Sequence, residues 1–231
     1  MSKDVEKKIA AEKSVEYIEN GMIIGIGTGS TVKYMIESLA EKVNKGLNVT
    51  AVTTSKVSED FAKSLGINVV DIDQVKEIDL TIDGADEFDK DLNGIKGGGG
   101  ALLYEKIVAA ASRKNIWITD SAKFVKKLGS FPLPVEVVPF GAEKVFYKFQ
   151  CLGYSPNFRM VNDSYFITDG GHFIIDLHLK EIENPYELNK QLNLLPGVIE
   201  TGLFLDIADL VIIGRDDSRE IIERDKKKTN L

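Results

Sequence analysis

The amino-acid sequence predicts an α/β fold: a doubly wound, mostly parallel sheet with a smaller α+β domain of the ferredoxin-like kind. Through about the first 130 residues, short apolar runs alternate with segments of helical periodicity. This alternation is typical of a parallel sheet with helices on both faces, and right-handed crossovers make such a sheet open and doubly wound. Three prolines, Pro132, Pro134 and Pro139, then interrupt the chain and mark a change in the order of the elements.

The first part of the chain contains a regular series of expected elements. They are helices at 3–20, 32–43, 57–65 and 101–111, strands at 22–26, 49–52, 78–82 and 116–119, and a further apolar run at 67–72. Within 32–43 the apolar residues recur at i, i+3, i+4, i+7 and i+8, so we expect this helix to bury one stripe.

After residue 130 the elements follow the order of an α+β unit. Strands are expected at 135–138, 158–160, 165–168, 173–179 and 199–205, and helices at 142–152 and 186–194. The last apolar run, 210–214, has no polar alternation, which suits a buried strand that returns to the first sheet. The predicted domains are therefore residues 1–130 plus 206–231 and residues 131–205, the second being an insertion.

The composition limits the classes of function. The formal net charge of −7 does not favour nucleic acid or an anionic membrane as a partner. No apolar stretch approaches the roughly 18 to 20 residues that cross a bilayer. A single cysteine, Cys151, fits a reducing compartment, and the N-terminal segment has no apolar signal core. We therefore expect a cytoplasmic protein in which the basic run 226–228 is a solvated tail.

A glycine-rich loop, Gly25–Thr31, lies between the first expected strand and the next helix. Glycines let a backbone approach a ligand, and the N–H groups at a helix start attract anions, so the phosphate of a small molecule is the favoured ligand. Ser30 stands where the dinucleotide fingerprint needs its third glycine, and the loop lacks the Gly-Lys-Ser/Thr of a P-loop. The structural alternative is a tight turn with a capping hydroxyl.

Two further motifs bring carboxylates. Asp83–Glu87 follows an expected strand, where open α/β sheets bind ligands, although Asp-Gly is also a common turn pair. The run Lys96–Gly100 leads into the helix that carries Glu105 on its apolar face, and its N–H groups can stabilise an oxyanion. Burial raises the pKa of such a carboxylate and the helix dipole lowers it, which suits a general base. A charge that merely complements the dipole is the alternative.

Metal sites are poorly supported. Asp89–Gly94 opens like a calcium-binding EF-hand loop, but the twelfth position, which should be Glu, is Gly100. His172 and His178 share a solvated strand face with Asp176, which is an insufficient ligand set for catalytic zinc. We therefore expect no metal and continued activity in strong chelators.

The candidate loops are expected to meet. Residues 25–31, 53–55, 83–86 and 120–123 all follow expected parallel strands, and the carboxyl ends of such strands lie on one rim of the sheet. Lys123 in the last loop could reach a phosphate or sugar oxygen, with a solvated surface charge as the simpler interpretation. Together the loops predict an enzyme that holds a small phosphorylated substrate and moves protons with carboxylates.

Four motifs in register resemble those of ribose-5-phosphate isomerase A, over nearly the whole chain. They are Gly25-Ile-Gly-Thr-Gly-Ser-Thr31, Asp83-Gly-Ala-Asp-Glu87, Lys96-Gly-Gly-Gly-Gly-Ala101 with Glu105, and Phe131-Pro-Leu-Pro-Val-Glu136. The resemblance implies a Rossmann-like domain with a small α+β insertion, and a homodimer or homotetramer. It also implies reversible interconversion of D-ribose 5-phosphate and D-ribulose 5-phosphate in the pentose phosphate pathway, without a metal or organic cofactor.

The resemblance also implies roles for single residues. Glu105 matches the base that shuttles a proton between C2 and C1 through an enediol. Asp83 and Lys96 match residues that handle ring opening and the O1 and O2 oxygens, and Asp86 lies beside them. The residues expected to bind the substrate are Lys7, Thr28, Gly29, Ser30, Thr31, Gly84, Ala85, Gly97, Gly98, Gly99 and Lys123.

Two other classes of function stay open on the sequence alone. One is an amino-sugar-phosphate deaminase or a CoA-transferase-like enzyme of the same fold, the latter using its glutamate as a nucleophile on an acyl group. The other is a non-catalytic sugar-phosphate sensor, although the sequence has no evident helix-turn-helix or basic patch. Deuterium uptake into the product from deuterated buffer distinguishes an isomerase from an acyl-transfer enzyme.

Overall fold

The computed structural model describes residues 3–225 and divides into two compact units. The first unit contains the chain up to Ala85, Tyr104–Lys123 and the chain from Asp206 onward, and the second contains Asp86–Leu103 and Phe124–Leu205. Residues 86–103 and 124–130 thus group with the second unit, whereas the sequence assigned them to the first domain. Compactness and independent folding are different properties, so the predicted domain boundaries stay a prediction.

The first unit is built on a six-stranded sheet with the order β15-β14-β6-β3-β1-β2. Its strands are β1 (Ile23–Ile26), β2 (Thr50–Thr53), β3 (Leu80–Gly84), β6 (Asn115–Asp120), β14 (Leu210–Arg215) and β15 (Ser218–Glu223). The first five run parallel, and β15 turns back antiparallel to β14. The predicted return of the last apolar run to the first sheet is therefore confirmed.

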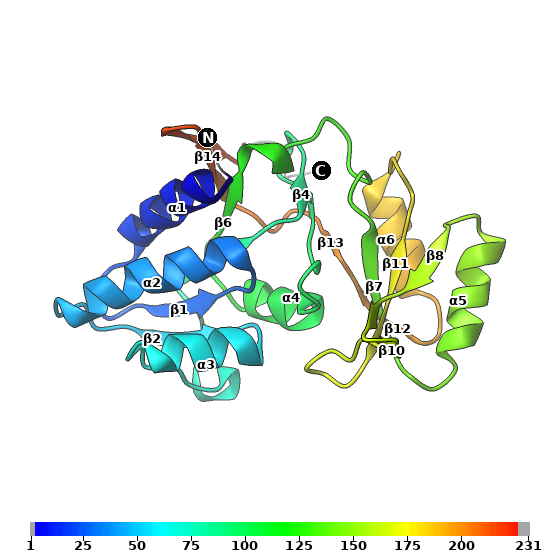
Figure 1. Cartoon of the computed structure of the whole chain (residues 1–231), viewed down its shortest axis with the longest axis horizontal. Coiled ribbons are helices and arrows are strands. Elements are labelled where there is room, and N and C mark those ends of the chain that lie inside the picture. The colour runs from blue at the N-terminus through cyan, green and yellow to red at the C-terminus, as the bar shows by residue number, and fades with distance from the viewer. Residues whose placement is uncertain (1–2, 226–231) are drawn as a thin grey trace. The chain divides into compact units, whose positions relative to one another are not determined.

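Helices cover both faces of this sheet, which confirms the α/β class. α1 (Lys3–Ser14) and α2 (Ser30–Asn44) lie side by side and bury their apolar stripes in one core with strand residues (Figure 1). α4 (Leu102–Ala110) covers the other face through Val108. A Cβ added at Gly25 would lie 2.7 Å from Val108 Cγ1, so the missing side chain lets α4 approach β1 closely.

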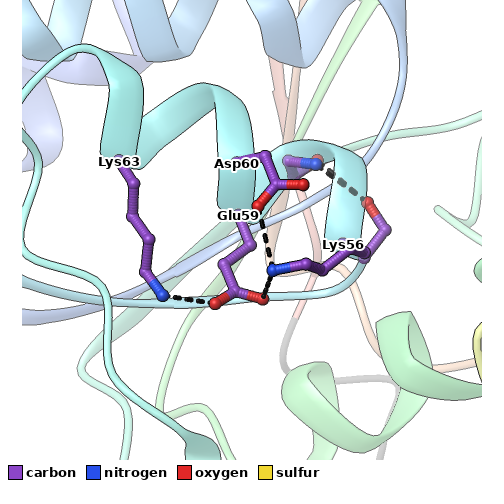
Figure 2. Close-up of polar contacts among 6 residues, drawn as sticks. Lys56, Glu59, Asp60 and Lys63 are labelled. Atoms are coloured by element: carbon purple, nitrogen blue, oxygen red, sulfur yellow. Dashed lines mark hydrogen bonds and ion pairs between the residues drawn. The ribbon is translucent and has the colours of Figure 1, made fainter.

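Helix α3 (Lys56–Ser64) follows β2 and carries ion pairs on its exposed face. Lys56 Nζ lies 3.3 Å from Glu59 Oε2 and 2.9 Å from Asp60 Oδ1, and Glu59 also pairs with Lys63 (Figure 2). Pairs at these i, i+3 and i, i+4 spacings favour the helical conformation. They support a short helix whose opposite face contributes to the first core.

The second unit contains a four-stranded antiparallel sheet with the order β12-β7-β11-β8. In chain order its elements are β7 (Leu133–Val137), α5 (Ala142–Cys151), β8 (Pro156–Phe158), β11 (Phe173–Leu177), α6 (Pro185–Asn193) and β12 (Val198–Thr201). Two strand–helix–strand units interleaved in this way form the ferredoxin-like arrangement, so this prediction is confirmed.

Several smaller elements complete the units. The second unit adds a three-stranded sheet, β4 (Glu87–Phe88), β5 (Gly94–Ile95) and β13 (Leu203–Phe204), and a hairpin of β9 (Met160–Val161) and β10 (Ser164–Tyr165). Single turns of 3-10 helix are η1 (Val15–Tyr17), η2 (Ile72–Gln74) and η3 (Ser121–Lys123).

The structure differs from the sequence predictions at several places, of which three follow. The apolar run 67–72 is not a strand: only Val69 bridges to Ala51, and the Asp71 side chain caps η2 instead. The expected strand 199–205 is split between two sheets as β12 and β13. The sequence did not predict β15, because its exposed, charged residues lack the apolar alternation of a half-buried strand.

Within residues 3–225, every helix is too short or too polar to cross a membrane. The basic run Lys226–Lys228, interpreted above as a solvated tail, lies outside the described residues.

Candidate active site

The carboxyl ends of four parallel strands of the first unit line up at one edge of its sheet. Ile26 of β1 pairs with Thr53 of β2 and with Ile82 of β3, and Gly84 of β3 pairs with Ile118 of β6. The loops that follow these strands therefore lie next to one another, as the order of strands and helices predicted. This rim carries the glycine loop, the first aspartate of the acidic motif and Lys123.

The glycine loop and β3 are in unusually close contact. The Asp83 carboxylate is 3% exposed, and its Oδ1 accepts hydrogen bonds from the Thr28 N–H at 3.1 Å and the Gly84 N–H at 2.7 Å. A Cβ added at Gly27 would lie only 1.9 Å from the same Oδ1. The absence of a side chain at Gly27 is thus what allows Asp83 to sit under the loop.

A cluster of hydroxyl groups connects the glycine loop to the residues that follow β2. The Thr28 Oγ1 lies 2.8 Å from Thr54 Oγ1 and donates to Ser55 Oγ, also at 2.8 Å. Ser58, on α3, donates its hydroxyl to the Gly27 carbonyl at 2.7 Å. The Thr28 hydroxyl and N–H both contact protein groups and so help to shape the loop, and its predicted role in binding substrate stays a prediction. Ser58 was not among the predicted site residues, although Ser55 three residues before it has the side chain of a typical helix N-cap.

The start of α2 has the properties of an anion site. Gly29 is the N-cap with φ of 127°, and within this described segment no side chain caps the helix and no acidic residue lies in its first turn. Ser30 is exposed and Thr31 is 9% exposed. An uncapped helix N-terminus presents N–H groups and a positive dipole end, to which phosphate binds well.

Glu105 lies in the first turn of α4 and is 3% exposed. Its helix is mostly apolar, and Leu102, Val108 and Ala109 beside it are buried. The carboxylate is thus withdrawn from water at the end of the helix where the dipole is positive. This is the environment that the sequence predicted for a general base.

Helix α1 is tied to the segment that carries Lys123. The Glu6 carboxylate accepts hydrogen bonds from the N–H of Ser121 at 2.9 Å, its hydroxyl at 2.8 Å, and the Asp216 N–H at 3.2 Å. The backbone hydrogen bond from Ser121 is the main reason why the pKa of Glu6 lies below its ordinary value. Lys7, next to Glu6, lies 3.7 Å from Asp4 in an ion pair. No local sequence pattern distinguishes Glu6 from the other charged residues of this helix.

In the second unit, the glycine run forms a closed turn. The Gly100 N–H donates to the Gly97 carbonyl at 2.9 Å, and both glycines have positive φ, 102° at Gly97 and 84° at Gly100. The Gly98 N–H donates to Asp86 Oδ2 at 2.7 Å, so this N–H is directed at the acidic motif. Lys96 is 2% exposed, and its ammonium lies 5.2 Å from the centroid of the Phe204 ring.

The predicted site residues thus fall into two groups. The first unit holds Lys7, Thr28, Gly29, Ser30, Thr31, Asp83, Gly84, Ala85, Glu105 and Lys123, and the second unit holds Asp86, Lys96, Gly97, Gly98 and Gly99. Within each unit the residues of a motif are hydrogen-bonded or adjacent in the chain. Their functional roles stay a prediction.

Asp89 and His172, two of the residues weighed above as metal ligands, form hydrogen bonds within the protein. Asp89 Oδ1 accepts hydrogen bonds from the N–H groups of Asp91 at 2.9 Å and Asn93 at 3.0 Å, which closes a turn. His172 Nδ1 lies 2.9 Å from Glu136 Oε1. Among the described residues 3–225, no three His, Cys, Asp or Glu side chains are arranged to hold a metal ion.

The doubly wound sheet with a glycine loop at its carboxyl edge, together with the ferredoxin-like second unit, defines a Rossmann-like α/β protein with an inserted α+β unit. A family model described as ribose 5-phosphate isomerase A (phosphoriboisomerase A) matches residues 50–218. Ribose-5-phosphate isomerase A of Levilactobacillus brevis is 50% identical over 224 residues, 96% of this chain and 98% of the relative. The chain therefore belongs to the ribose 5-phosphate isomerase A family.

Solved structures agree with this assignment. A D-ribose-5-phosphate isomerase in complex with phospho-erythronic acid has a TM-score of 0.94 at 39% identity, with 97% of this chain and all of that chain (100%) covered. Ribose 5-phosphate isomerase A from Neisseria gonorrhoeae has a TM-score of 0.91 at 40% identity, with 97% and 99% covered.

Proposed function

We propose that this chain interconverts D-ribose 5-phosphate and D-ribulose 5-phosphate and that Glu105 is the base that moves the proton. The activity follows from membership of the family: the chain is an aldose–ketose isomerase, and the deaminase, CoA-transferase-like and sensor alternatives are not favoured. The choice of Glu105 rests on its 3% exposure in the first turn of a mostly apolar helix that directly follows the glycine turn. A poorly hydrated carboxylate is well suited to accept a proton from carbon.

The reaction needs one base beside two adjacent carbons. In the open-chain aldose, Glu105 takes the proton from C2, the electron pair of that C–H bond forms a C1–C2 double bond, and the C1=O1 π electrons move to O1. O1 takes a proton from an acidic group or water, which is restored by the proton that O2 loses in the next step. The product is an enediol. Protonated Glu105 then returns its proton to C1, while the O2 hydroxyl loses its proton and C2 becomes the carbonyl carbon. The substrate is neither oxidised nor reduced overall, so acid–base groups and donors to oxygen suffice.

We assign Asp83 and Lys96 to ring opening and to the O1 and O2 oxygens, with Asp86 beside them. In support, the Asp83 carboxylate is buried and held by two N–H donors, and the Lys96 ammonium is almost fully withdrawn from water. A buried ammonium that faces a developing oxyanion is a strong stabilising charge, because little water competes for it. Asp86 follows Asp83 by three residues in the chain, so their Cα atoms are at most about 11 Å apart.

We assign the phosphate of the substrate to the start of α2. Ser30 and Thr31 supply hydroxyls and first-turn N–H groups there, and Lys7 and Lys123 supply positive charge. Gly29, Gly84, Ala85 and the exposed glycines of the 97–100 turn contribute backbone without side chains that would hinder the sugar. Phosphate binding remote from C1 and C2 orients the reacting carbons.

Phospho-erythronic acid, the compound bound to one relative, is expected to bind this chain as well. It carries a phosphate and a planar carboxylate, and the carboxylate resembles the two oxygens of the enediolate. It therefore reports on the groups that stabilise the intermediate, whereas inorganic phosphate reports on the phosphate site alone.

The decisive experiment is turnover of ribose 5-phosphate by wild type and Glu105→Gln, with Glu12→Gln as the matched control. Glu12 is exposed on α1 and lies 3.7 Å from Lys8 in a surface ion pair. Positioned general-base catalysis contributes about 10²- to 10⁴-fold, so Glu105→Gln should lose at least about 100-fold in kcat while Glu12→Gln keeps it. In deuterated buffer the wild-type ketose should carry deuterium at C1 in those turnovers in which the proton on Glu105 exchanges with solvent before it returns to C1. A folded Glu105→Gln protein with kcat within about tenfold of wild type would remove Glu105 from its role.

We further propose that the chain acts in the cytoplasm as a homodimer or homotetramer. The single cysteine supports a reducing compartment. Phe140 and Leu194 of the second unit are 96% and 73% exposed, and a second subunit that packed on them would remove this apolar surface from water. Sedimentation equilibrium at micromolar protein measures the state directly, and a monomer under these conditions would refute it.

A further inference from the structure

Arg159 connects the hairpin of the second unit to the glycine turn. Its guanidinium forms a fork with Asp176: Nε donates to Oδ2 at 2.9 Å and Nη2 to Oδ1 at 2.5 Å. The remaining nitrogen, Nη1, donates to the carbonyl of Gly97 at 2.7 Å and to that of Gly98 at 3.2 Å. The fork fixes the plane of the guanidinium, and the third nitrogen then points at two successive peptide groups of the turn.

The main chain around Arg159 is also fixed. Its N–H donates to the Ile174 carbonyl at 2.9 Å, and its carbonyl accepts from the Phe166 N–H at 2.8 Å. The Phe166 ring covers Gly100 so closely that an added Cβ there would lie 2.4 Å from the ring. Arg159 and Phe166 therefore hold the two ends of the Gly97–Gly100 turn from one hairpin.

The contact with Gly97 reaches a carboxylate assigned to the reaction. The Gly97 carbonyl and the Gly98 N–H belong to one peptide plane, and that N–H donates to Asp86 Oδ2 at 2.7 Å. A cation at the carbonyl polarises the peptide, which strengthens the hydrogen bond that its N–H donates. A continuous series of hydrogen bonds therefore runs from Asp176 through Arg159 and the Gly97–Gly98 peptide to Asp86.

We propose that Arg159 is a positioning residue of the isomerase: held by Asp176, it sets the conformation of the Gly97–Gly100 turn and, through one peptide group, the orientation of the Asp86 carboxylate. This inference rests on the proposed function, in which Asp86 and the turn act on the sugar oxygens. Four flexible glycines could take many conformations, and a charged clamp on their carbonyls reduces that freedom before substrate binds. Lysine would serve poorly here, because a single ammonium cannot form the fork with Asp176 and also reach both carbonyls.

The test uses the full chain with Arg159→Met, Arg159→Lys and Asp176→Asn. The control is Lys127→Met, which removes an ion-paired surface cation of the same unit, since Lys127 pairs with Glu181 and Glu183. For each variant, kcat, KM, the Kd of phospho-erythronic acid and Tm are measured. A displacement of about 1 Å in a catalytic group can cost about 100-fold, so Arg159→Met should lose about 10- to 100-fold in kcat.

The pattern across the measurements separates positioning from simple stability. We expect the KM of Arg159→Met to change little, its affinity for phospho-erythronic acid to fall with kcat, and Arg159→Lys to recover only part of the loss. Lys127→Met should match wild type throughout. A folded Arg159→Met protein with wild-type kcat and analogue affinity overturns the proposal. If Arg159→Met does not fold, Asp176→Asn is the test, because it weakens the hold on the guanidinium without removing it. A fall in its kcat and analogue affinity supports the proposal, and wild-type values overturn it.

Failure of this inference is distinguishable from failure of the proposed function. If wild type turns over ribose 5-phosphate and Glu105→Gln does not, while the Arg159 and Asp176 variants keep wild-type kcat, only the positioning role is wrong. If wild type shows no turnover, the proposed function is wrong and the positioning role is wrong with it.

Discussion

Replacing Gly27 by alanine should disturb the Asp83 carboxylate more than any other part of the first unit. The new Cβ would lie 1.9 Å from Asp83 Oδ1 and 2.1 Å from Cγ, whereas ordinary contacts begin at about 3.4 Å. The carboxylate or the loop must therefore retreat by about 1.5 Å. A shift of this size breaks the hydrogen bonds that Oδ1 accepts from Thr28 and Gly84, now 3.1 and 2.7 Å long.

The free energy of unfolding should fall by about 3 kcal/mol. Each hydrogen bond to a charged group contributes about 1.5 to 3 kcal/mol, and overpacking of a tight site costs about 1 to 3 kcal/mol, with partial relaxation offsetting the sum. For a chain of this length, 1 kcal/mol corresponds to about 2 to 4 °C, so Tm should fall by about 6 to 12 °C. The same displacement should lower kcat at least about tenfold, if Asp83 acts in the reaction.

Scanning calorimetry measures the Tm of wild type and of Gly27→Ala. The kcat of both proteins is measured at a temperature well below the lower of the two Tm values. Gly84→Ala is the matched control for stability, since its added Cβ would meet no atom nearer than the Thr28 carbonyl oxygen at 3.8 Å. A Tm of Gly27→Ala within about 2 °C of wild type would show that the loop relaxes without strain, and the reasoning from the Cβ contact would be refuted.

Two other substitutions test single carboxylates. The folded-state pKa of Glu6 lies below its ordinary value of 4.5, mainly because of the Ser121 N–H, so its charge stabilises the fold above that pH and the effect is lost as the pH falls through the lowered pKa. Glu6→Gln should therefore be less stable than wild type in urea at pH 7, and the difference should narrow as the pH falls below 4.5; a gap that widens in acid contradicts this. Glu87 accepts the N–H groups of Gly129 at 2.6 Å and Phe131 at 2.5 Å, so Glu87→Ala should lose about 3 kcal/mol in urea unfolding, and a loss below about 1 kcal/mol would contradict it.

The parts of the fold that could be predicted from the sequence are those with a local pattern. The apolar stripe of α2 and the mostly apolar strand β14 have periodicities that need no knowledge of distant residues. Strand–helix alternation then orders the strands, because parallel strands require crossovers. The glycine loop and Asp83 were placed on one rim by this argument, and the strand register agrees.

What could not be predicted depends on contacts between distant segments. Glu6 and Asp216 are 210 residues apart, and Arg159 and Gly97 are 62 apart. Nothing near Arg159 in the sequence distinguishes it from an arginine that faces water. The two residues Glu87 and Phe88 form a strand only because another short segment pairs with them. Neither propensity nor periodicity records such pairings.

The late return of the chain to the first sheet has a consequence for synthesis on the ribosome. β14 pairs with β6 and packs against α1, so closely that an added Cβ at Gly214 would lie 1.9 Å from the carbonyl oxygen of Glu6. A nascent polypeptide that ends near residue 205 has already made α1 and β6 but not their shared neighbour. Until β14 is synthesised, the edge of β6 has no pairing partner, and such an exposed strand edge can pair wrongly with other chains. A premature stop codon before β14 should therefore yield insoluble product rather than a shorter working enzyme.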